Sequence, residues 1–150
     1  MSETGAGNAT AASLETLKAG KCVLVVDDDP DIVILIKYHL ESEGYQVVAA
    51  YNGLEAFDQI SKHRPDLIVL DIMMPKVDGW VVCHSVKSTP NTRDIKVIIL
   101  TAKTQIRSKI KGLYIMQADL YMTKPFDLED LSGNIFKLLH LDDVALPVCS

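Results

Sequence analysis

Five side chains able to do chemistry stand at or just after the ends of apolar segments in this 150-residue chain. In chain order they are Asp27, Asp28, Asp71, Thr101 and Lys124. Carboxylate oxygens are ligands that Mg²⁺ prefers in proteins. A hydroxyl and an ammonium are donors suited to the oxygens of a phosphoryl group. If folding brings these side chains together, they form a site for a hard cation and a phosphoryl group.

Asp71 taken alone has a simpler interpretation, because an aspartate after a strand often does no more than cap a turn. Asp29 makes a third acid in a row after Asp27 and Asp28. We interpret Asp29 as the cap of a helix that Pro30 opens. The alternative register, with Asp28 and Asp29 as the metal pair, would place the acids deeper in the start of that helix.

The composition argues against several other kinds of site. The formal net charge of −5 disfavours a nucleic-acid-binding face, and no apolar run approaches the roughly 20 residues that a membrane span needs. The cysteines, Cys22, Cys83 and Cys149, are widely spaced, so neither a zinc site nor a disulfide framework is indicated. We therefore expect a cytoplasmic protein with no direct DNA binding and no membrane association.

Strict alternation of strands and helices is what would bring the five side chains together. Short runs rich in branched apolar residues predict strands, at 21–26, 45–50, 67–70, 95–100 and 119–122. Apolar residues at helical spacing predict a helix after each strand, beginning near residues 30, 53, 78, 104 and 127. The pattern indicates an α/β fold, a doubly wound five-stranded parallel sheet flanked by five helices. The carboxyl ends of its strands share one edge, where open sheets of this kind bind ligands.

One domain is expected, since a chain of this length usually forms a single domain with its own core. We expect it to cover residues 21–140. The small and polar residues 1–20 predict a flexible leader, with a short helical turn at 13–18, and residues 141–150 predict a C-terminal tail.

Trp80, the methionines that follow Asp71 and the histidines are interpreted as structural residues. We expect Trp80 to pack, partly exposed, near the third helix, and Met73 and Met74 to pack within the loop before it. Four histidines are expected at the surface or half-buried, not in a catalytic site: His39, His63, His84 and His140.

Four ordered motifs resemble the receiver domain of two-component response regulators. They are Val25-Val26-Asp27-Asp28-Asp29-Pro30, Asp71-Ile72-Met73-Met74-Pro75 with Asp78-Gly79, Thr101-Ala102, and Tyr121-Met122-Thr123-Lys124-Pro125-Phe126. The resemblance covers about residues 21–140. It implies a flavodoxin-like fold with strand order 2-1-3-4-5, similar to that of the stand-alone chemotaxis regulators.

The resemblance implies a phosphorylation site with a bound metal. Asp71 corresponds to the aspartate that is phosphorylated and that also ligates Mg²⁺ or Mn²⁺. Asp28 corresponds to a direct ligand of the ion, and Asp27 to an acid that helps to hold it through water. The backbone carbonyl of Met73 corresponds to a further ligand.

Three residues correspond to the parts of the family site that respond to phosphorylation. Thr101 and Lys124 correspond to the hydroxyl and the ammonium that bind the new phosphoryl group, and the Lys124-Pro125 bond is often cis in this family. Tyr121 corresponds to the aromatic switch residue that turns inward as Thr101 moves. The implied chemistry is self-phosphorylation from phosphohistidine and slow self-dephosphorylation, not that of a separate enzyme.

The implied partners are proteins. The phosphoryl donor would be a sensor histidine kinase or a histidine phosphotransfer protein. A downstream protein would bind the face formed by the fourth helix, the fifth strand and the fifth helix. Four basic residues lie on or beside the predicted fourth helix, either as a solvated face or as part of this partner surface: Lys103, Arg107, Lys109 and Lys111.

The last helix carries Ser132-Gly133-Asn134, where relatives that dimerise through this face often have a basic residue. We therefore expect a monomer or a weak dimer. No effector domain follows in this sequence, so we expect a stand-alone receiver or a piece of a longer protein.

Other functions are less consistent with the sequence. A dehalogenase-like phosphatase needs a second aspartate two residues after the nucleophile, where this chain has Met73. A flavin carrier of similar topology needs a phosphate-binding loop after the first strand, where the acids at 27–29 would repel the phosphate. An intermediate of a phosphorelay is not distinguished from a terminal switch by sequence. Met73 also cannot orient an attacking water, so we predict a longer-lived phosphorylated state than in chemotaxis-type relatives.

Overall fold

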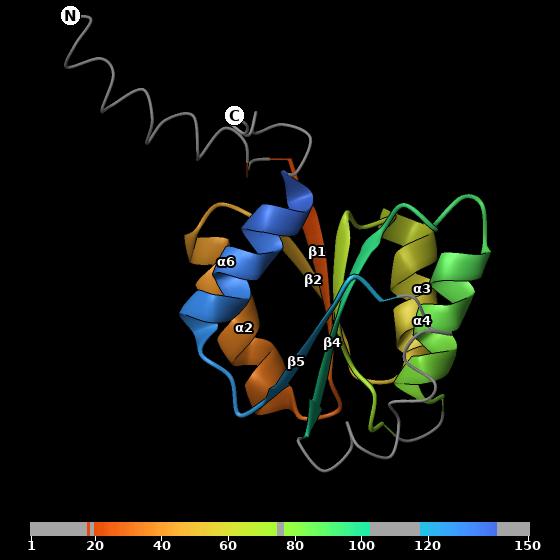
Figure 1. The fold of residues 1–150 in the computed structure, drawn as a ribbon, viewed down its shortest axis with the longest axis horizontal. Coiled ribbons are helices and arrows are strands. Elements are labelled where there is room, and N and C mark those ends of the chain that lie inside the picture. The colour runs from red at the N-terminus through yellow and green to blue at the C-terminus, as the bar shows by residue number, and fades with distance from the viewer. Residues whose placement is uncertain (1–17, 19, 75–76, 103–117, 141–150) are drawn as a thin grey trace, which may run out of the picture.

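The computed structural model describes residues 18, 20–74, 77–102 and 118–140 of the chain. Figure 1 shows the elements in this part of the chain, which are, in order, β1 (Cys22–Val26), α2 (Pro30–Ser42), β2 (Gln46–Ala50), α3 (Gly53–His63), β3 (Leu67–Asp71), α4 (Gly79–Ser88), β4 (Lys96–Ala102), β5 (Leu120–Lys124) and α6 (Leu128–Leu139). The predicted helix that begins near residue 104, most of the predicted leader and the predicted tail lie outside the described residues.

The five strands form one parallel sheet in the order β2-β1-β3-β4-β5, which confirms the predicted topology. Asp71, the last residue of β3, pairs with Leu100 of β4. Ala102 at the end of β4 pairs with Lys124 at the end of β5. The strands therefore end along a common edge of the sheet.

Alternate residues of the central strands face opposite sides of the sheet, and both sides are buried, as expected for a parallel sheet. Figure 1 shows α3 and α4 on one side of the sheet and α2 and α6 on the other. Leu24 and Ile68 belong to the core beneath α3 and α4, while Val23 and Leu67 belong to the core beneath α2 and α6. Burial on both sides explains the continuous apolar runs in the sequence, and the two layers of helices confirm the doubly wound α/β class.

Polar caps fix where the helices begin beside the carboxyl edge. Asp29 caps α2, as predicted: its side chain accepts a hydrogen bond from the N–H of Asp31, and Pro30 is the first helical residue. The other described helices α3, α4 and α6 are capped in a similar way, by Asn52, Asp78 and Asp127. Because each capping side chain satisfies a backbone N–H that has no partner within its helix, the caps hold the loops at this edge in place.

Two aromatic side chains are more buried than the sequence suggested. Trp80 is buried and not partly exposed, because it packs beside Tyr121, with ring centroids 6.5 Å apart. His140 was expected at the surface or half-buried, and this is wrong, because it is 1% exposed. Its ring lies beside that of Phe136, with centroids 4.4 Å apart. The other three histidines are half-buried or exposed, as expected.

Candidate functional site

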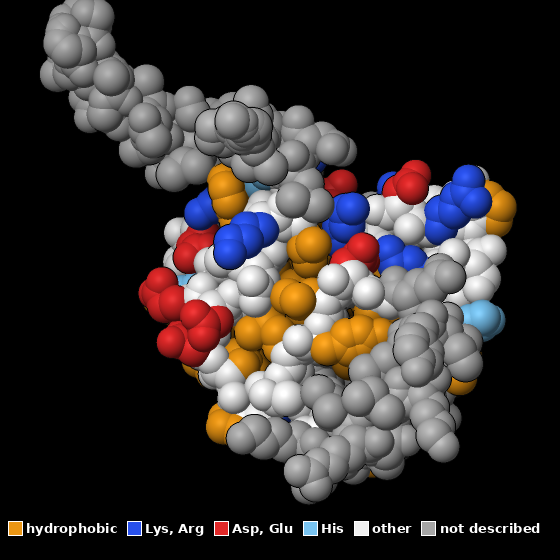
Figure 2. Space-filling view, in the orientation of Figure 1, with side chains coloured by type: hydrophobic (Ala, Val, Ile, Leu, Met, Phe, Trp, Pro, Cys, Tyr) orange, Lys and Arg blue, Asp and Glu red, His pale blue; other side chains and the backbone are white. Residues whose placement is uncertain are grey.

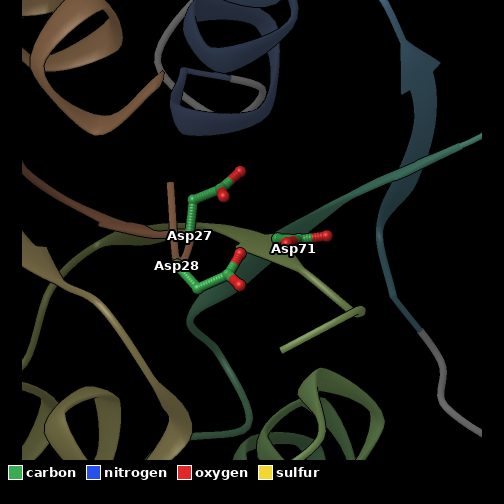
Figure 3. A group of neighbouring side chains, drawn as sticks. All are labelled: Asp27, Asp28 and Asp71. Carbon is green, nitrogen blue, oxygen red and sulfur yellow. The ribbon is translucent and has the colours of Figure 1, made fainter. Parts of the chain in front are cut away.

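Three carboxylates gather at the carboxyl edge of the sheet. Asp27 and Asp28 directly follow β1, and Asp71 ends β3. One oxygen from each carboxylate lies within 4.8 Å of the other two. Figure 3 shows the three side chains clustered where these neighbouring strands end. The structure therefore confirms that the acids singled out in the sequence lie together.

The acid cluster is largely buried. Asp27 is 1% and Asp71 is 4% exposed, whereas Asp28 is exposed. Burial and, after it, the neighbouring charge of Asp27 raise the pKa of Asp71 to about 6. The N–H of Met73, which donates to Asp71 Oδ1 over 3.1 Å, and the charge of Lys124 act in the opposite direction. Near neutral pH the Asp71 carboxylate is thus held in surroundings that disfavour its charge.

Lys124 supplies the positive charge of the site. Its Nζ lies 2.8 Å from Asp27 Oδ2 and 3.7 Å from Asp71 Oδ1. Burial by itself lowers the pKa of Lys124, but the hydrogen bond and the charge of Asp27, with smaller contributions from Asp71 and Asp28, outweigh it and raise the pKa. Lys124 therefore remains an ammonium at neutral pH. The peptide bond between Lys124 and Pro125 is cis, in agreement with the family pattern.

Thr101 and Tyr121 lie on the two strands beyond β3. Thr101 is buried near the end of β4, and its Oγ1 donates to the carbonyl of Ala102 over 3.3 Å. Tyr121 lies on β5, paired with Ile99 of β4, and its half-buried ring packs near Trp80. The sheet thus places the predicted hydroxyl at the same edge as the acids, with the predicted switch aromatic on the neighbouring strand.

Met73 and Gly79 bound the loop that follows Asp71. The side chain of Met73 is half exposed, so the expectation that it packs within the loop is wrong. Its backbone N–H bonds to Asp71, so its contribution to the site is made by the backbone. A Cβ at Gly79 would lie 2.4 Å from the carbonyl oxygen of Asp71 and 2.6 Å from the Cα of Ile72. Only glycine permits α4 to begin this close to the end of β3. Sequence reasoning identified Gly79 as a helix start but missed this contact, for which the Asp78-Gly79 pair is the signal.

The donor set fits a hard divalent cation. It consists of carboxylate oxygens alone, which suits Mg²⁺ or Mn²⁺ better than zinc or copper. A cation among the acids would also relieve the repulsion that raises the pKa of Asp71. Within 18, 20–74, 77–102 and 118–140, no second group of three His, Cys, Asp or Glu residues has this arrangement.

A doubly wound parallel sheet with acids after its first and third strands, and a lysine at the end of its fifth, defines a flavodoxin-like domain with a carboxylate-rich edge. The family model described as the response regulator receiver domain matches residues 23–136. The chain belongs to this family. Receiver domains accept phosphoryl groups and are not enzymes in the ordinary sense, and they interact with histidine kinases.

The relatives include full regulators and separate receiver domains. The DNA-binding dual master transcriptional regulator RpaA of Synechocystis sp. is 43% identical over 121 residues, which cover 81% of this chain and 50% of RpaA. This chain spans about half the length of the curated relatives it matches.

Two solved structures illustrate the similarity of fold. The signal receiver domain of a signal transduction histidine kinase from Syntrophus aciditrophicus is 34% identical with a TM-score of 0.76, over 87% of this chain and 98% of that one. The response regulator TrrA from Thermotoga maritima, in complex with Mg²⁺ and BeF, is 37% identical with a TM-score of 0.68, over 79% of this chain and 98% of that one. Across the described elements of the present chain, no helix is both long and apolar enough to cross a membrane.

Proposed function

We propose that this chain is a phospho-acceptor switch whose receiver domain covers residues 21–140 and whose acceptor is Asp71. The observation that carries the proposal is the geometry around Asp71. Three carboxylates have oxygens within 4.8 Å of one another, and the ammonium of Lys124 lies 2.8 Å from Asp27 and 3.7 Å from Asp71. This arrangement combines a nucleophile, a cation site and a donor for the phosphoryl oxygens.

The phosphoryl donor would be a phosphohistidine on a sensor histidine kinase or a histidine phosphotransfer protein, met in the cytoplasm. A carboxylate oxygen of Asp71 attacks phosphorus in line. The O–P bond forms as the N–P bond breaks, and the histidine nitrogen that leaves takes up a proton. The product on this chain is an acyl phosphate.

The residues that would hold Mg²⁺ or Mn²⁺ are Asp27, Asp28, Asp71 and the backbone carbonyl of Met73. When bound, the ion supplies positive charge that offsets the charge on the transferring oxygens. The similarity to TrrA, which has been crystallised with Mg²⁺ and BeF, supports this assignment. Lys124 supplies the second positive charge, since its ammonium already lies near Asp71 Oδ1.

Thr101 and Tyr121 would convert phosphorylation into a change of surface. The added negative charge attracts the hydroxyl of Thr101, and the ring of Tyr121 follows into the space that Thr101 vacates. Trp80 lies beside Tyr121 and is the only tryptophan of the chain. Its fluorescence is therefore a direct reporter of this movement.

The changed surface would engage a downstream protein on the side of β5. β5 is an edge strand whose residues are all half-buried. Figure 2 shows hydrophobic side chains gathered over the middle of this view, where Figure 1 draws β5 in front of β4. The proposal includes a monomer or weak dimer that does not itself bind DNA, in keeping with the net charge of −5.

The test is intact-mass spectrometry after incubation with Mg²⁺ and acetyl phosphate, a small phosphoryl donor. The wild type is expected to gain one phosphoryl group, and Asp71→Asn and an EDTA-treated sample are expected to gain none. Asp58→Asn is the matched control, because Asp58 is an exposed residue of α3 paired with Lys62, and it should react like the wild type. Phosphorylation of Asp71→Asn at the wild-type rate would overturn the proposal.

A further inference from the structure

Gly53, the first residue of α3, lies directly against the loop that connects β3 to α4. A Cβ at Gly53 would lie 2.4 Å from the Cβ of Val77, 2.6 Å from its carbonyl oxygen and 2.8 Å from its Cγ1. Ordinary contacts between such atoms begin near 3.4 Å. Any side chain at position 53 must therefore displace Val77 or the start of α3.

The start of α3 is fixed by its capping bonds and by burial. Asn52 Oδ1 accepts a hydrogen bond from the N–H of Glu55 over 2.9 Å, and Glu55 Oε1 accepts one from the N–H of Tyr51 over 2.8 Å. Ala56 in the same turn is fully buried. Because these bonds and contacts hold α3, Val77 is the part that has to move.

The loop is also fixed at its base. The N–H of Gly79 donates to the carbonyl of Ile72 over 3.3 Å, and Gly79 packs against the backbone of Asp71 without room for a Cβ. A displacement of Val77 therefore cannot be absorbed at Gly79. It is expected to reach Met73, the residue whose N–H bonds to Asp71 and whose carbonyl is the proposed metal ligand.

We infer that Gly53 is a positioning residue for metal binding, because its lack of a side chain sets where the loop after Asp71 sits. The inference rests on the proposed function. Mg²⁺ demands near-ideal octahedral geometry with ligands at about 2.0–2.1 Å. A displacement of about an ångström at one ligand is thus expected to weaken binding, by the roughly 10- to 100-fold that loss of supporting contacts around a metal typically costs.

The test is calorimetric titration of the full chain with Mg²⁺, without any phosphoryl donor. Gly53→Ala is expected to raise the dissociation constant at least about tenfold. The matched control is Gly133→Ala in α6, where nothing lies within 4 Å of the added Cβ, and its dissociation constant should equal that of the wild type. Thermal unfolding in EDTA, measured in parallel, separates a shifted loop from a general loss of stability.

A second variant distinguishes displacement of Val77 from other effects of the alanine. Val77→Gly removes two of the three short contacts, those of Cβ and Cγ1, and leaves the contact with the carbonyl oxygen. The double variant Gly53→Ala with Val77→Gly is therefore expected to regain part of the affinity lost by Gly53→Ala, measured against Val77→Gly alone. If Gly53→Ala does not fold, the double variant is expected to fold and to bind Mg²⁺. Its affinity for Mg²⁺, compared with that of Val77→Gly alone, then tests the role of Gly53.

The outcomes separate this inference from the proposed function. If the wild type binds Mg²⁺ and Gly53→Ala binds it with equal affinity, the role of Gly53 is overturned and the proposed function still stands. Strictly additive effects of the two substitutions overturn it as well. A wild type that binds no Mg²⁺ refutes the metal site itself.

Discussion

Replacing Asp71 by asparagine should stabilise the metal-free protein. In the folded chain the pKa of Asp71 is raised from an ordinary value of 3.8 to about 6, first by burial and then by the charge of Asp27. At about 1.4 kcal/mol per pKa unit, this rise in the pKa corresponds to about 3 kcal/mol of stability that is lost when the carboxylate is charged. Asp71→Asn keeps the shape of the side chain and removes that charge.

The sign of the pH dependence follows from the same pKa. Between about pH 4 and 6 the folded chain retains a proton on Asp71 that the unfolded chain has released, so the free energy of unfolding falls as pH rises through this window. Asp71→Asn lacks this contribution. The two proteins should therefore have similar stability near pH 4, and the variant should be more stable above pH 7.

Thermal unfolding in EDTA measures the effect. At roughly 2–4 °C per kcal/mol for a chain of this size, Asp71→Asn is expected to unfold about 6–12 °C above the wild type at pH 7.5. Asp58→Asn, at an exposed pair with Lys62, should change little. Adding Mg²⁺ at 100 times its dissociation constant should then stabilise the wild type by about 2.7 kcal/mol and the variant by less. An Asp71→Asn variant that is no more stable than the wild type at pH 7.5 would refute the reasoning. A variant that exceeds the wild type by as much at pH 4 as at pH 7.5 would refute it as well.

Three further predictions concern other parts of the molecule. Lys124→Ala leaves the buried charge of Asp27 without its 2.8 Å partner and should cost about 3 kcal/mol in EDTA; a loss under about 1 kcal/mol in urea unfolding at pH 7 contradicts this. Lys87→Ala removes a 2.8 Å ion pair to Asp119 and a 2.7 Å bond to the carbonyl of Ile95; it should cost about 1–3 kcal/mol, and an unchanged urea midpoint contradicts this. Because Met73 cannot orient an attacking water, the phosphorylated state should persist for minutes or longer; a direct decay assay giving a half-life of seconds contradicts this.

The order of strands and helices could be predicted because the sequence signals agree with one another. Branched apolar runs mark strands buried on both sides, and Asp29 and Asp127 stand where helix caps are needed. A parallel sheet then leaves one common edge, so residues as distant in sequence as Asp27 and Lys124 are expected together. The structure places their side chains in direct contact.

Side-chain partners could not be predicted in the same way. We expected Lys124 just after the fifth strand, but pairing with β4 extends β5 to include it. Its hydrogen-bonding partner here is Asp27, which only distances can decide. Apolar type alone does not mark the buried face of a helix, since Leu54 of α3 and Val81 of α4 are more than half exposed.

Close backbone contacts were the least visible in the sequence. The sequence pattern predicts a helix that begins near residue 53, and the structure adds that Asn52 caps α3 and that Gly53 has no room for a side chain beside Val77. A glycine needed for conformational freedom and one needed for close packing look alike in a sequence. The three-dimensional contact is what distinguishes them.

On the proposed function, Asp71 holds phosphorus reversibly in a site assembled from a cation and residues at the ends of β1, β3, β4 and β5. Borohydride reduction of the phosphorylated protein tests it directly, because it converts an aspartyl phosphate to homoserine, which peptide mass spectrometry can locate. We predict homoserine at position 71 after treatment with acetyl phosphate and Mg²⁺, and unmodified aspartate there when EDTA replaces Mg²⁺. Homoserine at another aspartate, or modification that does not depend on the metal, would contradict the claim.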